Sequence, residues 1–300
     1  MNPPPLRLIA ILLGVLVGFG GLSAAEPENQ QPTKDDIEQE QLEKGLADKD
    51  VNVRRKAANK LQDPRGMNKL PLIEKALADQ DTDVRKSASN GLYKQLAHAT
   101  CRIGLHVLRH QAENEKIVLP MVEKALSDDD AQVREWANLS LGRIGGEKAL
   151  ALLEKGLADK DANVRGRAAE ALGNHGWSKA SWYFARALSS EDAYRHFYTA
   201  TVGKEQEWGK KAVPLLEKAF ADENHVVRMN VAEALGYTGG DMARDVLLDQ
   251  LIAEKDPKVL EEISKSLREH YADDPAVQKA LKDAEARQPK EKPQPSQDEF

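Results

Sequence analysis

The residues best suited to do chemistry lie in one short stretch: Cys101, His106 and His110. His106 and His110 are four residues apart, so on a helix they share one face, an arrangement that suits a zinc or copper ion. Cys101 precedes Arg102, whose charge favours a thiolate. No neighbouring carboxylate completes a recognised motif, and the alternative is polar surface for the histidines and a small core residue for Cys101. We therefore predict no metal site, and keep a metal-dependent or lyase-like enzyme as the second hypothesis.

No other pattern in the chain is typical of catalysis. Cys101 is the single cysteine, which excludes an internal disulfide and any CxxC site. Beyond residue 25 there is no glycine-rich phosphate loop, nucleophile elbow or zinc-protease helix. We therefore predict no catalytic residues and no cofactor.

The composition favours long amphipathic helices and argues against nucleic acid as the partner. Lys and Arg number 43 against 49 Asp and Glu, for a net charge of −6, so a basic surface that neutralises phosphates is not expected over the whole chain. Charged residues make up 31% and aromatic residues 5%, whereas sheets favour β-branched and aromatic side chains.

The two ends of the chain differ from its body. Residues 6–22 form an apolar run followed by Ser-Ala-Ala, the pattern of a cleaved signal peptide over residues 1–25. This predicts an exported protein, periplasmic or secreted, without membrane insertion after cleavage; an uncleaved membrane anchor is the alternative. Residues 26–36 are expected to be a flexible linker. Residues 285–300, rich in Pro, Lys and Glu, are expected to be a disordered tail.

The body repeats one motif. Residues 153–165 nearly reproduce residues 42–54, and related copies recur along the chain. The copies close on Arg54, Arg85, Arg134, Arg165 and Arg228. A faded copy ends at Arg195, a seventh ends at Leu260, and about 18 extra residues, near 97–115, interrupt the series. The period is therefore about 31 residues.

Within each unit the apolar pattern is helical and changes phase once, as in Leu150/Leu153/Leu157 followed by Val164/Ala168/Leu172. An acidic tetrad such as residues 159–162 separates the two stripes, and its second aspartate is suited to cap the following helix. Glycines follow the second stripe, where they suit helix ends. These glycines are Gly142, Gly173 and Gly236. Each unit is thus predicted to be a helix–turn–helix whose stripes are buried by stacking on its neighbours.

The string Asp-x-x-Val-Arg-x-x-Ala-x-x-x-Leu, with Pro-x-Leu upstream, resembles the short HEAT repeats of the phycobilisome-lyase type. The resemblance implies an all-α, right-handed α-solenoid of about seven hairpins over residues 37–284. It also implies convex first helices, concave second helices, and a ladder in which each repeated arginine reaches an acidic turn of the next unit. None of the seven histidines is followed by Glu, which argues against an iron-dependent hydroxylase of this repeat class. A signal segment argues against attachment of bilins to cytoplasmic proteins.

We predict that the second helices carry the binding surface, at positions one, two and five after each ladder arginine. This face begins basic, becomes apolar in its middle and ends mostly acidic. The predicted partner-binding residues are Trp136, Leu139, Arg167, Phe197 and Met229. Exposed apolar groups rimmed by charge are typical of a protein-binding groove. The sequence therefore predicts a non-catalytic scaffold or adaptor for a protein or peptide partner, and defines no oligomeric state.

One segment allows two interpretations. Residues 177–208 hold 8 of the chain's 15 aromatic residues and coincide with the faded copy. Either the rings fill a core from which the usual Leu/Ala packing has been lost, or they form a recognition patch.

Overall fold

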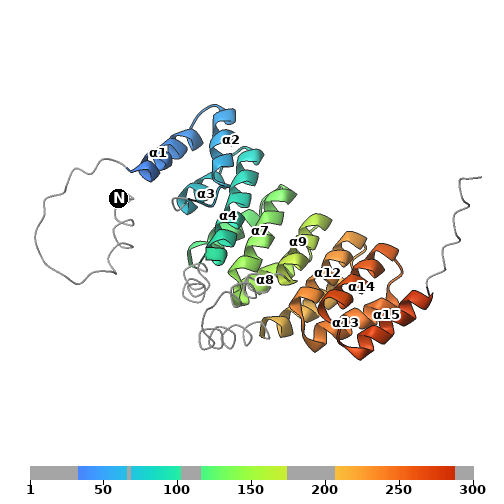
Figure 1. Ribbon diagram of the computed structural model, residues 1–300. Coiled ribbons are helices and arrows are strands. Elements are labelled where there is room, and N and C mark those ends of the chain that lie inside the picture. Colours follow the sequence, from blue (N-terminus) through green and yellow to red (C-terminus); the bar gives the residue numbers. More distant parts are fainter. Residues whose placement is uncertain (1–32, 66–68, 103–115, 174–206, 288–300) are drawn as a thin grey trace, which may run out of the picture.

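The computed structural model describes residues 33–65, 69–102, 116–173 and 207–287, and these residues form helices without a strand (Figure 1). The helices of the first half are α1 (Lys34–Leu46), α2 (Val51–Lys60), α3 (Leu70–Ala76), α4 (Thr82–Arg102), α6 (Leu119–Leu126), α7 (Ala131–Ile144), α8 (Gly146–Gly156) and α9 (Ala162–Gly173). Those of the second half are α12 (His225–Thr238), α13 (Gly240–Ala253), α14 (Pro257–His270) and α15 (Pro275–Arg287), with a helical segment over residues 207–219 before α12.

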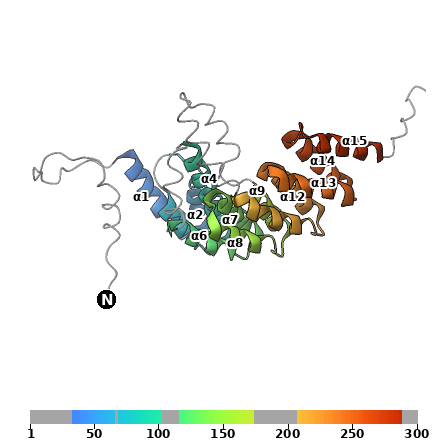
Figure 2. The same cartoon turned by 90° about the horizontal axis from the view of Figure 1, so that it is seen from below.

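The helices form hairpins that stack into two rows. The second helices α2, α4, α7, α9, α12 and α14 pack on one another in an unbroken series, and the first helices contact one another less closely. In a curved double row the more closely packed row is the inner one, and Figure 2 shows that the array curves. The second helices therefore line the concave side, as the sequence predicted for this α-solenoid.

The predicted stripes form one continuous core. Val84, Val133 and Val164, which begin the second-helix stripes, are buried along with the leucines that end them. Val53, at the same position in the first hairpin, is 39% exposed. No hairpin precedes α1 among the described residues, so nothing from a neighbouring unit covers this valine.

The glycines predicted to end the second helices lie where adjacent second helices approach each other closely. α7 and α12 continue past Gly142 and Gly236 and are capped by Gly145 and Gly239, whose φ angles are 66° and 69°. A Cβ on Gly142 would lie 2.8 Å from the carbonyl oxygen of Ala171 on α9. Gly173, the last residue of α9, and Gly236 likewise face α12 and α14. These positions are glycine because adjacent second helices approach too closely for a side chain. The prediction that they end helices was wrong for Gly142 and Gly236, whereas α9 does end at Gly173.

The array is closed at its carboxyl end and its helices extend past the predicted bounds. α1 begins at Lys34, inside the predicted linker, where Thr33 and Asp36 form a capping box. α15 runs to Arg287, inside the predicted tail; it buries Val277, and Glu285 pairs with Arg268. In the part of the chain that the structure describes, no helix is both long and apolar enough to cross a membrane.

Candidate protein-binding surface

An arginine ladder runs along the turns between first and second helices. Arg134 Nε lies 2.8 Å from Asp159 Oδ2 of the next hairpin, and Nη1 donates to the carbonyls of Asp128 and Asp129 in its own turn. The other four arginines make the same contacts, Arg54 with Asp79, Arg85 with Asp128, Arg165 with Asp222 and Arg228 with Glu254. Each arginine therefore ties its own turn to the turn of the following hairpin.

The carboxylates of the ladder also hold their own turns. Asp159 Oδ1 accepts hydrogen bonds from Arg134 Nη2 and from the Asp161 amide, both at 2.9 Å. Asp161 in turn accepts the amide of Asn163 at 2.8 Å and caps α9. Burial raises the pKa of Asp159, but the hydrogen bonds from Arg134 and the Asp161 amide outweigh it, so the pKa lies below its usual range. The pKa of Asp128, Asp222 and Glu254 is lowered for the same reasons.

The ladder passes over the faded copy. Arg165 pairs with Asp222 at 2.5 Å, and α9 packs directly on α12, so these two described second helices are neighbours. The predicted unit that ends at Arg195 lies outside the described residues. Phe197 itself lies outside the described residues.

Several cations of the predicted binding face form ion pairs within the array. Arg55 Nη2 lies 2.7 Å from Asp81 on the next hairpin, and hydrogen bonding from Arg55 lowers the pKa of Asp81 to about 2. Lys86 Nζ lies 3.0 Å from Asp130. Arg167 was predicted to contact the partner. In the structure it lies 2.7 Å from Glu170, on its own helix, and 3.5 Å from Glu135 on α7.

An aromatic group with an adjacent cation lies in the middle of the second-helix row. The rings of Tyr93 on α4 and Trp136 on α7 are 5.5 Å apart between centroids and tilted by 36°. The Arg143 guanidinium lies 5.5 Å from the Tyr93 ring centroid, and Nη2 donates to the Tyr93 hydroxyl at 3.1 Å. All three side chains are half-buried. We call Tyr93, Trp136 and Arg143 the Trp136 cluster.

Two cations of the second-helix row were missed from the sequence: Arg143, beside the Tyr93 ring, and Lys94, which follows Tyr93 in the chain. Arg143 and Lys94 are each the ninth residue after a ladder arginine, one helical turn beyond the last position sampled on this face. Lys94 Nζ donates to Gln62 Oε1 at 3.2 Å. Within the described residues no carboxylate pairs with either cation. Extending the sampled positions by one turn would have found both, together with Tyr93.

The remaining predicted binding residues do not form one strip. Leu139 is buried, 8% exposed, because α4 and α9 pack on both sides of α7 and leave little room. Met229 on α12 is half-buried and packs against the core. Between Trp136 and Met229 lies α9, which presents Arg167 with its glutamate partners. The predicted contiguous apolar strip is therefore interrupted by an ion-pair group.

The predicted chemistry of the insertion lies beyond the description. His106 and His110 are outside the described residues, as is the side chain of Cys101. Among the residues that are described, no group of three or more His, Cys, Asp or Glu is arranged to hold a metal ion. Of the aromatic-rich segment, Trp208 is described: it is 8% exposed and its Nε1 donates to the carbonyl of Leu172 at 2.9 Å, so this ring fills core.

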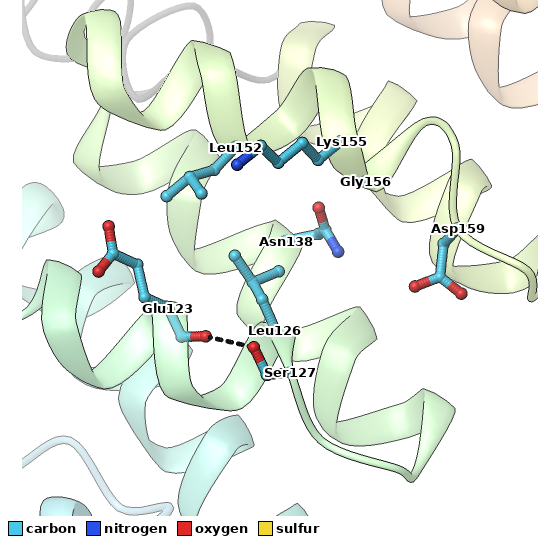
Figure 3. Close-up of a pocket in the computed structure, with 8 residues that line it drawn as sticks. All are labelled: Glu123, Leu126, Ser127, Asn138, Leu152, Lys155, Gly156 and Asp159. Atoms are coloured by element: carbon cyan, nitrogen blue, oxygen red, sulfur yellow. Dashed lines mark hydrogen bonds between the residues drawn. The ribbon is translucent and has the colours of Figure 1, made fainter.

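A pocket of about 360 Å³ opens on the outer side, between α6 and α8 (Figure 3). Its lining consists of Glu123, Leu126, Ser127, Asn138, Leu152, Lys155, Gly156 and Asp159. Asn138 is fully buried; its Nδ2 donates to the Arg134 carbonyl at 2.9 Å, and its Oδ1 has no hydrogen-bond partner. A Cβ on Gly156 would collide with this oxygen. The glycine therefore makes room for the asparagine of the preceding hairpin.

The stacked hairpins, the ladder and the closely packed inner row define a helical repeat protein of the solenoid class. A family model of HEAT repeats matches residues 105–173 and 183–268, more than half of the chain. The chain belongs to the HEAT repeat family, which confirms the family predicted from its motif. No curated protein matches the chain.

The solved structures similar to this chain include an engineered protein, a designed repeat protein and an enzyme. An engineered protein is 20% identical with a TM-score of 0.45, over 83% of this chain and 97% of its own. A designed armadillo repeat protein is 18% identical with a TM-score of 0.43, over 76% and 98%. Human deoxyhypusine hydroxylase, solved in complex with glycerol, is 21% identical with a TM-score of 0.24, over 79% and 97%.

Proposed function

We propose that this protein is an exported, non-catalytic scaffold that binds a protein or peptide partner on its concave second-helix row, centred on the Trp136 cluster. The observation that carries the proposal is the contrast within this row. Arg55, Lys86 and Arg167 pair with carboxylates of the array, whereas Tyr93 and Trp136 are half-exposed beside Arg143, which pairs with no carboxylate of the described residues. Aromatic side chains and arginine are the residues that dominate binding energy at protein interfaces.

The chemistry of the cluster defines the kind of segment that would bind. The Trp136 ring offers an apolar surface, and Arg143 offers donors to an acidic group. A partner segment with a large apolar side chain next to a carboxylate satisfies both. The carboxylate compensates the charge of Arg143, and the apolar side chain removes the exposed ring surface from water.

Export rests on residues 1–25 alone. It is tested by the amino-terminal sequence of the protein recovered from the native cell, which should begin near Glu26 if the signal is cleaved. A protein that keeps residues 1–25 in the cytoplasm would contradict this part of the proposal.

Binding is tested by site-specific photo-crosslinking of the full chain in its native compartment. A photoreactive residue at Tyr93 should give a discrete crosslinked product, and the same residue at Lys124, on the outer helix α6, should not. Trp136→Ala in the Tyr93 variant should abolish the product. Equal crosslinking from both positions, or none from Tyr93, would contradict a binding surface here. Stoichiometric metal in the purified protein that is lost on replacing His106 and His110 would contradict the non-catalytic part.

A further inference from the structure

The first hairpin presents the kind of surface that the next hairpins bury between units. Val53 is 39% exposed, whereas its counterparts from Val84 to Val259 are buried. Asp48 accepts the Asp50 amide at 2.8 Å, as the other ladder carboxylates do with their own turns. Among the described residues, however, no arginine or lysine side chain pairs with the Asp48 carboxylate. The acceptor half of a ladder contact is thus exposed at the amino-terminal end of the array.

This end surface has a nearly identical copy inside the array. Residues 42–54 and 153–165 differ only at Val51, which corresponds to Ala162. The inner copy is covered by α7 of the preceding hairpin. Arg134 binds Asp159 at 2.8 Å through Nε, and Asn138 fits against Gly156. The inner copy therefore shows what the end surface is shaped to bind.

The counterparts of both contacts are present at the end surface. Gly45 corresponds to Gly156 and Asp48 to Asp159. A Cβ on Gly156 would meet both Asn138 and Ala168, whereas a Cβ on Gly45 would meet only Ala57, at 2.9 Å, of its own hairpin. The space that receives an asparagine in the inner copy is thus free of a neighbouring hairpin beside Gly45. Charge and shape both favour the same occupant.

The chain itself is poorly equipped to supply that occupant. Residues 26–32 contain no arginine, and their glutamates have the same sign of charge as Asp48. At the other end of the array Leu260 replaces the ladder arginine and α15 covers the last hairpin. In a second folded copy, α7 is already covered by α9. A second copy of this chain therefore offers no matching surface.

We propose that the amino-terminal end surface, formed by Gly45, Asp48 and Val53, binds a helical hairpin of another protein. The second helix of that hairpin presents an arginine to Asp48 and, four residues later, an asparagine to Gly45. The partner extends the array by one unit and covers Val53. The partner's chemistry is that of α7, in which Arg134 and Asn138 have this spacing.

The first experiment uses a fluorescein-labelled peptide of residues 116–145, which spans α6 and α7, titrated with the full chain and followed by fluorescence anisotropy. We expect saturation at one peptide per chain. Asp48→Asn in the protein, and separately Arg134→Ala or Asn138→Leu in the peptide, should each weaken binding at least 10-fold. The matched control is Asp249→Asn, which removes the same charge from the exposed surface of α13 and should leave binding unchanged. Saturable binding that ignores Asp48→Asn would overturn the proposal.

In the second experiment the hairpin is covalently linked to the chain, so that binding no longer requires two molecules to associate. Residues 116–145 are fused directly before residue 35, the register in which residue 145 precedes residue 146 in the native chain. Linkage raises the effective concentration of the hairpin to the millimolar range. The fusion should melt about 3 °C or more above the unfused chain, and Asp48→Asn should cancel the gain. No gain in melting temperature, together with no binding of the free peptide, would also overturn the proposal.

Discussion

Arg134 and Arg143 lie on the same helix, nine residues apart, but differ in burial and in the groups that they contact. Arg134 is buried, binds Asp159 through two nitrogens, and has an equivalent in four other hairpins. Arg143 is half-exposed, contacts a tyrosine ring and hydroxyl, and has only Lys94 as a cationic equivalent among the described second helices. The difference teaches that the interaction repeated in five hairpins holds the array together. A cation of the middle hairpins that pairs with no carboxylate of the described residues is the one we propose for partner binding.

The largest effect should come from the inner row of helices. Gly142→Leu places a side chain where even a Cβ would lie 2.8 Å from the Ala171 carbonyl, so α7 and α9 must move apart. Overpacking of this kind usually costs 1–3 kcal/mol, and a backbone contact leaves little room to adjust, so we expect a loss of about 3 kcal/mol in the free energy of unfolding. Urea unfolding of the two proteins measures it.

A matched pair of smaller substitutions controls for helix propensity. Gly→Ala in a helix is favourable by up to about 1 kcal/mol when space allows. At Gly209 a Cβ would lie 3.4 Å from Thr238 Cγ2, an ordinary contact. Gly209→Ala should therefore stabilise and Gly142→Ala destabilise. The same sign at both positions would show that close helix approach does not require glycine in the inner row.

Arg165→Ala should act on architecture and leave the Trp136 cluster intact. Removal of the guanidinium leaves Asp222 and two turn carbonyls with fewer donors, at a cost of about 1–3 kcal/mol. Urea unfolding should show the loss, while crosslinking from position 93 should be unchanged. Unchanged unfolding with lost crosslinking would reverse the assignment of the ladder to structure.

Acid should weaken the ladder as a whole. The pKa of Asp128, Asp159, Asp222 and Glu254 is lowered in the folded state, below unfolded values near 3.9 for Asp and 4.3 for Glu. A lowered folded pKa contributes stability that is complete above the unfolded pKa and is lost as the pH falls through the folded pKa. The free energy of unfolding should therefore change little from pH 7 to about pH 5 and decline below about pH 4. Arg165→Ala, with one ladder contact fewer, should lose less over this range.

The smallest effect on stability, and the sharpest on binding, should come from Trp136→Ala. The ring contacts Tyr93 but is half-buried, and an aromatic pair of this kind contributes about 0.5–1.5 kcal/mol. Partner affinity should fall by about 2 kcal/mol if Trp136 is a hot spot. Titration of the crosslinked partner, once identified, measures the affinity. Severe unfolding of the variant would instead assign the ring to the core.

The repeated features could be predicted because the same residues recur at the same positions in several units. Four of the five arginines pair with the acidic turn of the next unit in the sequence, so both members of those contacts are visible there, whereas Arg165 pairs with Asp222, beyond the faded copy. Gly142 was misread because the pattern shows that glycine follows an apolar stripe but not how closely α9 approaches. The contact of α9 with α12 was not predicted either, because the spacing of the faded motif at Arg195 places a unit between them and only the packing of the two helices shows that they are neighbours. Tyr93 and Arg143 meet across two helices, a contact that no single repeat displays.

The passage of the ladder over the faded copy has a consequence for the entropy of the chain. The contact between Arg165 and Asp222 closes a loop of 57 residues, against 25 for Arg134 and Asp159. Because closure entropy grows only with the logarithm of loop length, the longer loop costs about 0.7 kcal/mol more. The 43-residue separation of Arg85 and Asp128 costs less still. Insertions between a second helix and the next first helix are therefore thermodynamically cheap, and the junctions after α4 and α9 are places where this chain can gain sequence without unstacking its neighbours.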